Sequence, residues 1–172
     1  MEEKSLFLIA VFDDETQKTL AGYYDVLRRN GFTGSQTKDI PYHITLGNRD
    51  TACEEQLINK MDNICAETNS IKIMMSHIGL FGLNVLFIAP NMNTELLTLQ
   101  RLLFFPEYTS GCHHWAAHAT LLIDEPDKIL KALPDAAGCF KPFEARIVKV
   151  ALYEFFPIRF IKEFILSASA PR

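Results

Sequence analysis

The sequence predicts an α+β protein with two pseudo-symmetric lobes, each an antiparallel sheet with helices, around a central cleft. Strand and helix patterns alternate along the chain, and two stretches have the pattern of hairpins. The pattern His-x-Thr-Leu also occurs twice, at residues 43–46 and 118–121, and each copy is followed by a helix and a hairpin. This order is typical of an internal duplication. We therefore expect residues 1–172 to form one two-lobed domain.

The first half of the chain begins with a short apolar run, Ser5–Phe12, whose residues favour a buried strand. Acidic residues that can cap a helix follow, and apolar positions at helical spacing predict a helix over residues 15–29, with Gly31 as its left-handed cap. The first motif then lies on an expected strand over residues 42–47. A second helix is expected over residues 53–66.

The second half repeats this order around the second motif. Glycine and asparagine near residues 81–84 predict the turn of a hairpin. Proline at position 126 favours the first turn of a helix that follows the second motif strand. The expected elements are a hairpin with arms before and after residues 81–84, a helix over 93–105, a strand over 115–123, a helix from about 124, and a final hairpin over 143–154 and 159–167.

The composition describes an ordinary soluble protein. Of the 172 residues, 48% are hydrophobic and 22% are charged, and the net charge is −4. Extensive nucleic-acid binding needs a broad basic face, so the expected partner is a small nucleotide or an RNA end. Four scattered cysteines without a C-x-x-C pair, an acid-flanked apolar start and no apolar run of about 20 residues predict a cytoplasmic protein without disulfides, signal peptide or membrane span. We expect a monomer.

The repeated motif brings together groups suited to phosphoester chemistry. Side chains two apart on a strand face the same way, so His43 projects with Thr45, and His118 with Thr120. If the two strands meet across one cleft, one imidazole can act as a base and the other as an acid near neutral pH. The threonine hydroxyls can hydrogen-bond the non-bridging phosphate oxygens. Neither a metal nor another cofactor is required.

Three further residues are candidates for substrate binding. Tyr42 and Tyr108 could stack on a base, as aromatic residues do in the recognition of single-stranded RNA. For two other aromatic residues, Phe81 and Trp115, packing in the core is the alternative to stacking. Arg49 continues the alternation from the first motif and could contact phosphate. A solvated surface position is the alternative for Arg49.

A rival interpretation is a zinc site in the segment "CHHWAAH", where Cys112, His113, His114 and His118 are potential ligands. The strand pattern of residues 115–123 disfavours it, because positions four apart on a strand are separated by about 13 Å. The prediction is therefore that the chain holds no metal and that His77 is a structural strand histidine.

The segments "YHITLG" and "AHATLL", 75 positions apart, resemble the paired signatures of the two-histidine (2H) phosphoesterase superfamily, within it the bacterial 2′-5′ RNA ligase and cyclic phosphodiesterase group. The resemblance implies a bilobal α+β fold and metal-independent hydrolysis, or in reverse ligation, of 2′-linked phosphoesters such as 2′,3′-cyclic nucleotides or RNA ends. By position it makes His43 and His118 the acid/base pair, and Thr45 and Thr120 the phosphate-binding residues. The chain departs from the family at Ala117, where proline is frequent. It also has only leucine and isoleucine directly after the second motif threonine, where some relatives carry a basic residue.

A function of another class keeps the fold without the reaction. The same cleft could bind a nucleotide or an RNA end without turning it over. Two histidines in matching positions favour the enzyme, because binding alone does not need a proton donor facing a proton acceptor.

Overall fold

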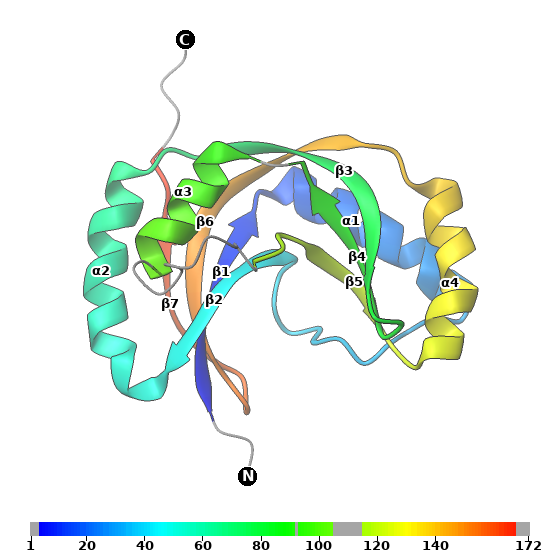
Figure 1. Cartoon of the computed structure of the whole chain (residues 1–172), viewed down its shortest axis with the longest axis horizontal. Coiled ribbons are helices and arrows are strands. Elements are labelled where there is room, and N and C mark those ends of the chain that lie inside the picture. Colours follow the sequence, from blue (N-terminus) through cyan, green and yellow to red (C-terminus); the bar gives the residue numbers. More distant parts are fainter. Residues whose placement is uncertain (1–3, 92, 105–114, 168–172) are drawn as a thin grey trace.

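The computed structural model describes residues 4–91, 93–104 and 115–167, which form one antiparallel sheet with helices packed on it (Figure 1). The strands run in the order β2-β1-β6-β3-β4-β5, and β7 also pairs with β6. The α+β class is therefore confirmed. The strands are β1 (Ser5–Phe12), β2 (His43–Asp50), β3 (Ile71–Phe81), β4 (Val85–Pro90), β5 (Ala119–Ile123), β6 (Phe143–Phe155) and β7 (Arg159–Ile165), and the helices are α1 (Asp14–Arg29), the short 3₁₀ turn Thr51–Cys53, α2 (Glu54–Glu67), α3 (Thr94–Phe104) and α4 (Pro126–Cys139).

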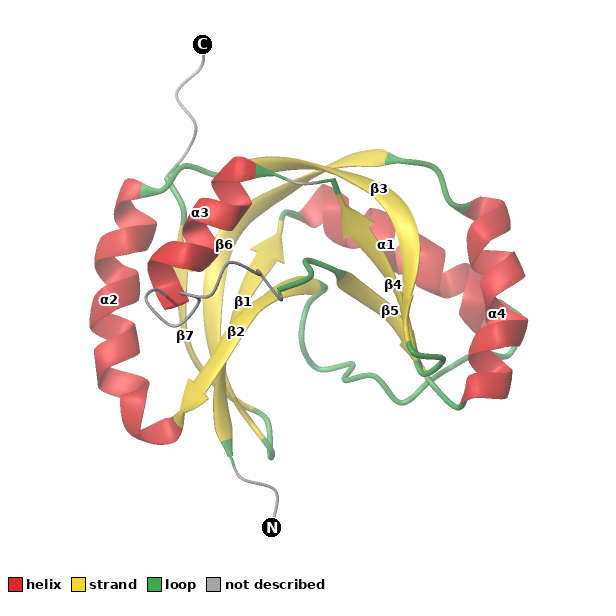
Figure 2. Ribbon diagram, in the orientation of Figure 1, coloured by secondary structure: helices red, strands yellow, loops and turns green. Residues whose placement is uncertain are grey.

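The long strand β6 joins the two lobes into one continuous sheet (Figure 2). Along one edge, its residues 143–147 pair with β3 and its residues 149–154 pair with β7. Its other edge pairs with β1. One lobe thus contains β1, β2, β7 and most of β6, and the other contains β3, β4 and β5. The two motif strands, β2 and β5, lie at the two ends of the strand order.

The helices are exchanged between the halves of the chain. Helix α1 directly follows β1, yet it packs with α4 against the lobe of β3, β4 and β5. Helices α2 and α3 contact each other and cover β7 and β2 of the first lobe. Position in the sequence therefore does not decide which lobe a helix covers. The connection of residues 30–42 leads from α1, which lies on the lobe of β3, β4 and β5, back to β2 of the first lobe.

The main hydrophobic core lies between the sheet and the helices. On β1 the side chains of Leu6, Leu8, Ala10 and Phe12 enter this core, as the alternation of a strand requires. The residues between them face the opposite side of the sheet, where a smaller apolar cluster contains Ile9, Val11, Ala151 and Tyr153. This second face carries the candidate site. None of the described helices has the length and apolar character needed to span a membrane.

Candidate active site

A cleft of about 610 Å³ lies on the face of the sheet away from the main core. Three of the four motif side chains, those of His43, Thr45 and Thr120, line it. The structure thus brings residues from both motif strands to one cavity. The other lining residues are Ser5, Phe7, Tyr24, Gln36, Thr37, Lys38, Ile40, Pro41, Tyr42, Ile123, Phe155 and Phe156.

The first motif is held on β2 by its pairing with β1. His43 lies opposite Val11 and Thr45 opposite Ile9, so both project to the face of the smaller apolar cluster. Helix α1 fixes the strand just before the motif. The Gln17 side chain donates to the Tyr42 carbonyl oxygen (2.7 Å) and accepts from the Tyr42 backbone N–H (2.9 Å).

The second motif begins one residue before its strand. The sequence predicted a strand over residues 115–123, whereas β5 begins at Ala119. Thr120 lies opposite Phe87 on β4. The His118 ring packs against Phe87 and Phe81, with centroids 5.1 and 4.6 Å away. His118 is not among the residues that line the cleft, although the charge on its ring acts on His43, which does line it.

Both imidazoles are held in the same way. The Nδ1 of His43 is 2.8 Å from the carbonyl oxygen of Pro41, and the Nδ1 of His118 is 2.8 Å from that of Ala116. A carbonyl oxygen only accepts hydrogen bonds, so each Nδ1 carries a proton. In the neutral form of each ring, Nε2 is therefore the atom that can take up a proton.

Burial lowers the pKa of both histidines below the ordinary value of 6.5. Desolvation is the main cause in each case, and the hydrogen bond to the backbone carbonyl opposes it. A positive charge on His118 lowers the pKa of His43 further, so the two rings are close enough to interact. Such a pair holds a single proton more readily than two.

A tryptophan links the two motifs. The indole N–H of Trp115, three residues before His118, donates to the carbonyl oxygen of Thr45 at 2.8 Å. Trp115 also packs on the main core. From the sequence, Trp115 could either pack in the core or stack on a base. The structure places it in a packing position that connects the two motifs.

Each motif strand has a β-bulge directly after the threonine. In β2 the register passes from Thr45 opposite Ile9 to Gly47 opposite Leu8, and Leu46 is the extra residue. In β5 it passes from Thr120 opposite Phe87 to Leu122 opposite Leu86, and Leu121 is the extra residue. The leucine shared by the two motifs is thus the bulged residue in both. Both leucines are buried in the main core.

The bulge in β2 corrects the expectation for Arg49. After the bulge, Gly47 and Arg49 face the helices instead of the cleft, and the Arg49 guanidinium lies 4.4 Å above the ring of Phe104. A Cβ on Gly47 would come within 2.5 Å of the same ring. Arg49 lines a separate depression with Lys4 and Asp50. The alternation assumed from the sequence fails because one inserted residue exchanges the two faces of a strand.

An aromatic wall, formed by Phe7, Phe155 and Phe156, was not predicted. Phe7 and Phe155 pack edge to face with centroids 4.9 Å apart, and Phe156 follows in the β6–β7 turn. The Phe156 side chain is 56% exposed while lining the cleft. No pattern in the sequence indicated it, because this wall joins the first strand to a turn near the other end of the chain.

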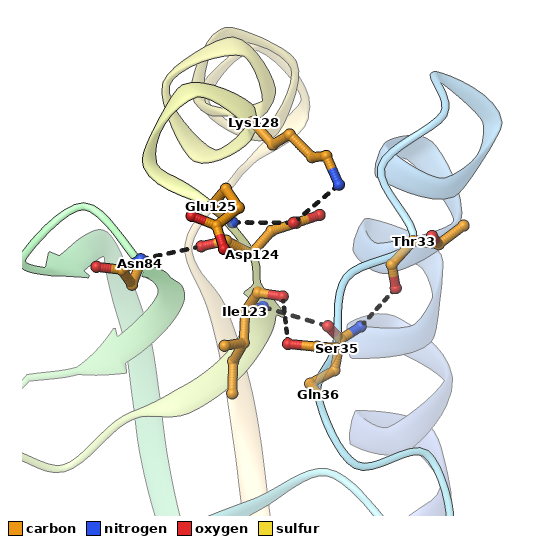
Figure 3. Close-up of polar contacts among 8 residues, drawn as sticks. All are labelled: Thr33, Ser35, Gln36, Asn84, Ile123, Asp124, Glu125 and Lys128. Carbon is orange, nitrogen blue, oxygen red and sulfur yellow. Dashed lines mark hydrogen bonds and ion pairs between the residues drawn. The ribbon is translucent and has the colours of Figure 1, made fainter.

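The segment of residues 33–42 forms another wall of the cleft and is anchored to β5. The Ser35 backbone N–H and hydroxyl both donate to the carbonyl oxygen of Ile123, at 2.7 and 3.2 Å. The Ile123 N–H donates to the side chain of Gln36 at 3.2 Å (Figure 3). The segment is therefore attached to one motif strand and continuous with the other.

The remaining candidates have different outcomes. Tyr42 lines the cleft, and burial raises its pKa to about 12, so its hydroxyl stays protonated and can donate. His77 is exposed on β3, with its Nδ1 2.9 Å from the Ser76 hydroxyl. Within the described part of the chain, no cluster of three or more potential metal ligands occurs. Outside the described residues lie Tyr108 and three of the potential zinc ligands, Cys112, His113 and His114.

Comparison with known proteins identifies the fold. No protein-family model and no curated protein matches the sequence. Among solved structures, LigT from E. coli in its apo form superimposes with a TM-score of 0.62 at 17% identity, over 96% of this chain and 99% of that one. A structure described as a phosphoesterase gives a TM-score of 0.66 at 16% identity, over 95% and 99%. TT0787 from Thermus thermophilus gives 0.64 at 15% identity, over 96% and 100%. The chain therefore has a LigT-like fold, and the resemblance to the 2H phosphoesterases seen in the sequence is confirmed in the fold.

Proposed function

We propose that this protein is a metal-independent 2H cyclic phosphodiesterase that opens a 2′-linked phosphoester, such as a 2′,3′-cyclic nucleotide or a cyclic RNA end. The observation that carries the proposal is the matched state of the two motif histidines. Both rings have Nδ1 on the carbonyl two residues earlier, both have a lowered pKa, and they interact electrostatically.

In the proposed reaction, the Nε2 atoms of the two imidazoles carry the proton transfers. One neutral imidazole removes the proton from the attacking water, and the other, protonated, gives its proton to the ribose oxygen that leaves phosphorus. Thr45 and Thr120 donate hydrogen bonds to the non-bridging oxygens, where negative charge increases in the transition state. In the reverse direction the roles exchange, and a 2′-linked ester forms.

The rest of the cleft favours a nucleotide as the substrate. Phe7, Phe155 and Phe156 offer an apolar surface on which a base can stack. Structures of the LigT with the same fold have been solved in complex with 3′-AMP, ATP and NADP⁺. A ligand of this size also fits the volume of the cleft.

The test is turnover of 2′,3′-cyclic mononucleotides by purified protein, with products separated by chromatography. We expect His43→Ala and His118→Ala each to lower kcat by roughly 10²–10⁴-fold, because each removes one proton transfer. The double variant should lose less than the product of the two losses, since both groups serve one displacement. His77→Ala is the matched control, because this exposed histidine lies on β3 outside the cleft and should leave turnover unchanged.

Two outcomes would contradict the proposal. If one motif histidine proves dispensable, paired acid/base catalysis is wrong. If the wild-type protein binds cyclic nucleotides but never opens them, the cleft is a binding site and the chain is not an enzyme. Thorough chelation before the assay should leave the activity intact. If chelation abolishes the activity and added zinc restores it, the zinc site in the segment "CHHWAAH" is favoured instead.

A further inference from the structure

We infer that the cleft recognises a second phosphate on its substrate through Lys38. The substrate class would then be a nucleotide or RNA end that carries a phosphate beyond the reacting one. This inference rests on the proposed function and narrows it. The shared chemistry is a phosphate on the far side of the same ribose, which either a free nucleotide or an RNA chain can supply.

The charge of the cleft is the first observation. Among the described lining residues, Lys38 is the one lysine or arginine, and no aspartate or glutamate lines the cavity. Lys38 has no ion-pair or hydrogen-bonding partner within the described part of the chain, and the neighbouring Asp39 does not line the cleft. In a chain with a net charge of −4, this makes the cleft a locally positive site for an anion.

The position of Lys38 is the second observation, because the segment that carries it is fixed on both sides. Before Lys38, Ser35 and Gln36 are bonded to Ile123 of β5 (Figure 3). The Tyr24 hydroxyl also donates to the Thr33 carbonyl oxygen at 2.8 Å. After Lys38, the Gln17 side chain bonds both backbone groups of Tyr42.

Close packing reinforces this attachment. Gly34 has a φ of +63°, and a Cβ there would lie 2.7 Å from the Leu122 side chain and 2.9 Å from the Ile123 carbonyl oxygen. The backbone of the segment is thus seated directly on β5. A lysine on such a support can place its ammonium group at the cleft with little loss of backbone entropy.

The absence of another suitable cation from the described lining of the cleft is the third observation. Leucines and an isoleucine follow Thr120, and Arg49 lies on the opposite face of β2 above Phe104. Lys4 lines the separate depression and is paired with Glu154 at 2.8 Å. The two threonines can satisfy the reacting phosphate with neutral hydrogen bonds. The cationic side chain that the described cleft offers is therefore available for a further anionic group.

The first experiment measures binding, independently of turnover. Calorimetry would compare adenosine 3′-monophosphate with adenosine 3′,5′-bisphosphate on the wild type and on Lys38→Ala, Lys38→Arg and Lys131→Ala. We expect the wild type to bind the bisphosphate about tenfold more tightly, as one charge-assisted contact at an accessible site allows. Lys38→Ala should lose this advantage and Lys38→Arg should keep it. Lys131→Ala, an exposed position on α4, is the control and should match the wild type.

The second experiment identifies the source of the phosphate by turnover. The substrates are a 2′,3′-cyclic mononucleotide, the same compound with a 5′-phosphate, and a dinucleotide that ends in a cyclic phosphate. A Lys38-dependent gain of about tenfold in kcat/KM for either phosphate-bearing substrate supports the inference. If kcat/KM rises with the dinucleotide alone, the preferred substrate is an RNA end. If it rises with the 5′-phosphorylated mononucleotide, the preferred substrate is a free nucleotide.

The inference is overturned if the wild type shows no preference for the bisphosphate, or if Lys38→Ala weakens both adenosine ligands equally. If the protein prefers the bisphosphate in a Lys38-dependent way but turns over none of the three substrates, the proposed function is wrong and the second phosphate site is still supported. The two failures are thus distinguishable.

Discussion

Gln17 is the side chain through which helix α1 holds the first motif, and its replacement gives a prediction with two separable parts. Gln17→Ala removes the hydrogen bonds of 2.7 and 2.9 Å to the backbone of Tyr42. At roughly 1 kcal/mol for each bond, the loss in the free energy of unfolding is about 2 kcal/mol. For a protein of this size, such a loss lowers Tm by about 4–8 °C.

The catalytic part follows from the place of Tyr42 between Pro41 and His43. The Pro41 carbonyl oxygen orients the His43 ring, so a freed backbone at Tyr42 lets the imidazole move relative to the cleft. A displacement of about 1 Å of a reacting group can cost 10²-fold, so we expect kcat to fall by about 10- to 100-fold and KM to change less. Gln17→Glu is the sharper variant, because an ionised carboxylate still accepts from the Tyr42 N–H but cannot donate to its carbonyl.

The assay pairs thermal unfolding with kinetics on a 2′,3′-cyclic nucleotide. Gln56→Ala, an exposed glutamine on α2, is the control for loss of a helical glutamine. A Gln17→Ala protein with lowered Tm but unchanged kcat and pH profile would show that these two hydrogen bonds have a structural role only. An unchanged Tm would mean that they do not hold the strand in solution.

Two further outcomes are expected. The kcat/KM of the wild type should peak on the acid side of pH 6.5 and fall as the pH rises toward 8. The reason is that the pKa values of both histidines are lowered and the reaction needs one ring protonated. A maximum above pH 7 would contradict this assignment. Gly47→Ala should destabilise the protein by about 1–3 kcal/mol, because the added Cβ would lie 2.5 Å from the ring of Phe104. The matched variant Gly138→Ala in α4 places its Cβ in open space and should be neutral or stabilising in thermal unfolding. Equal Tm values for the two alanine variants would refute the close packing of β2 on α3.

The element order could be predicted from the sequence because it depends on local periodicity. The expected strand at Ser5–Phe12 has the bounds of β1, and the first helix differs from α1 by one residue at its start. Local patterns do not show which elements pack against each other. The crossing of α1 to the lobe of β5 depends on contacts between distant parts of the chain, and so does the meeting of Phe7 with Phe155.

At the two bulges, the alternation in the sequence does not decide which face of the strand a residue occupies. The run from His43 to Arg49 alternates in a way that a regular strand would satisfy, so Arg49 was assigned to the cleft. The paired strand decides otherwise, since the register with β1 skips Leu46. The repeated leucine was itself a signal in the sequence, although its meaning becomes clear only from the matching bulge at Leu121.

The same bulges define the chemistry that the cleft can support. Each strand changes face directly after its threonine, so each places one threonine at the cleft, two residues after a motif histidine, before its next residues return to the core. The two halves are alike in this, in the carbonyl that fixes each Nδ1, and in the burial that lowers each histidine pKa. In the proposed reaction neither histidine is built to be only the acid or only the base. The substrate therefore determines which histidine gives the proton and which accepts one. The aromatic wall and Lys38 have no counterparts in this duplication, and they are the parts of the cleft that can select the substrate.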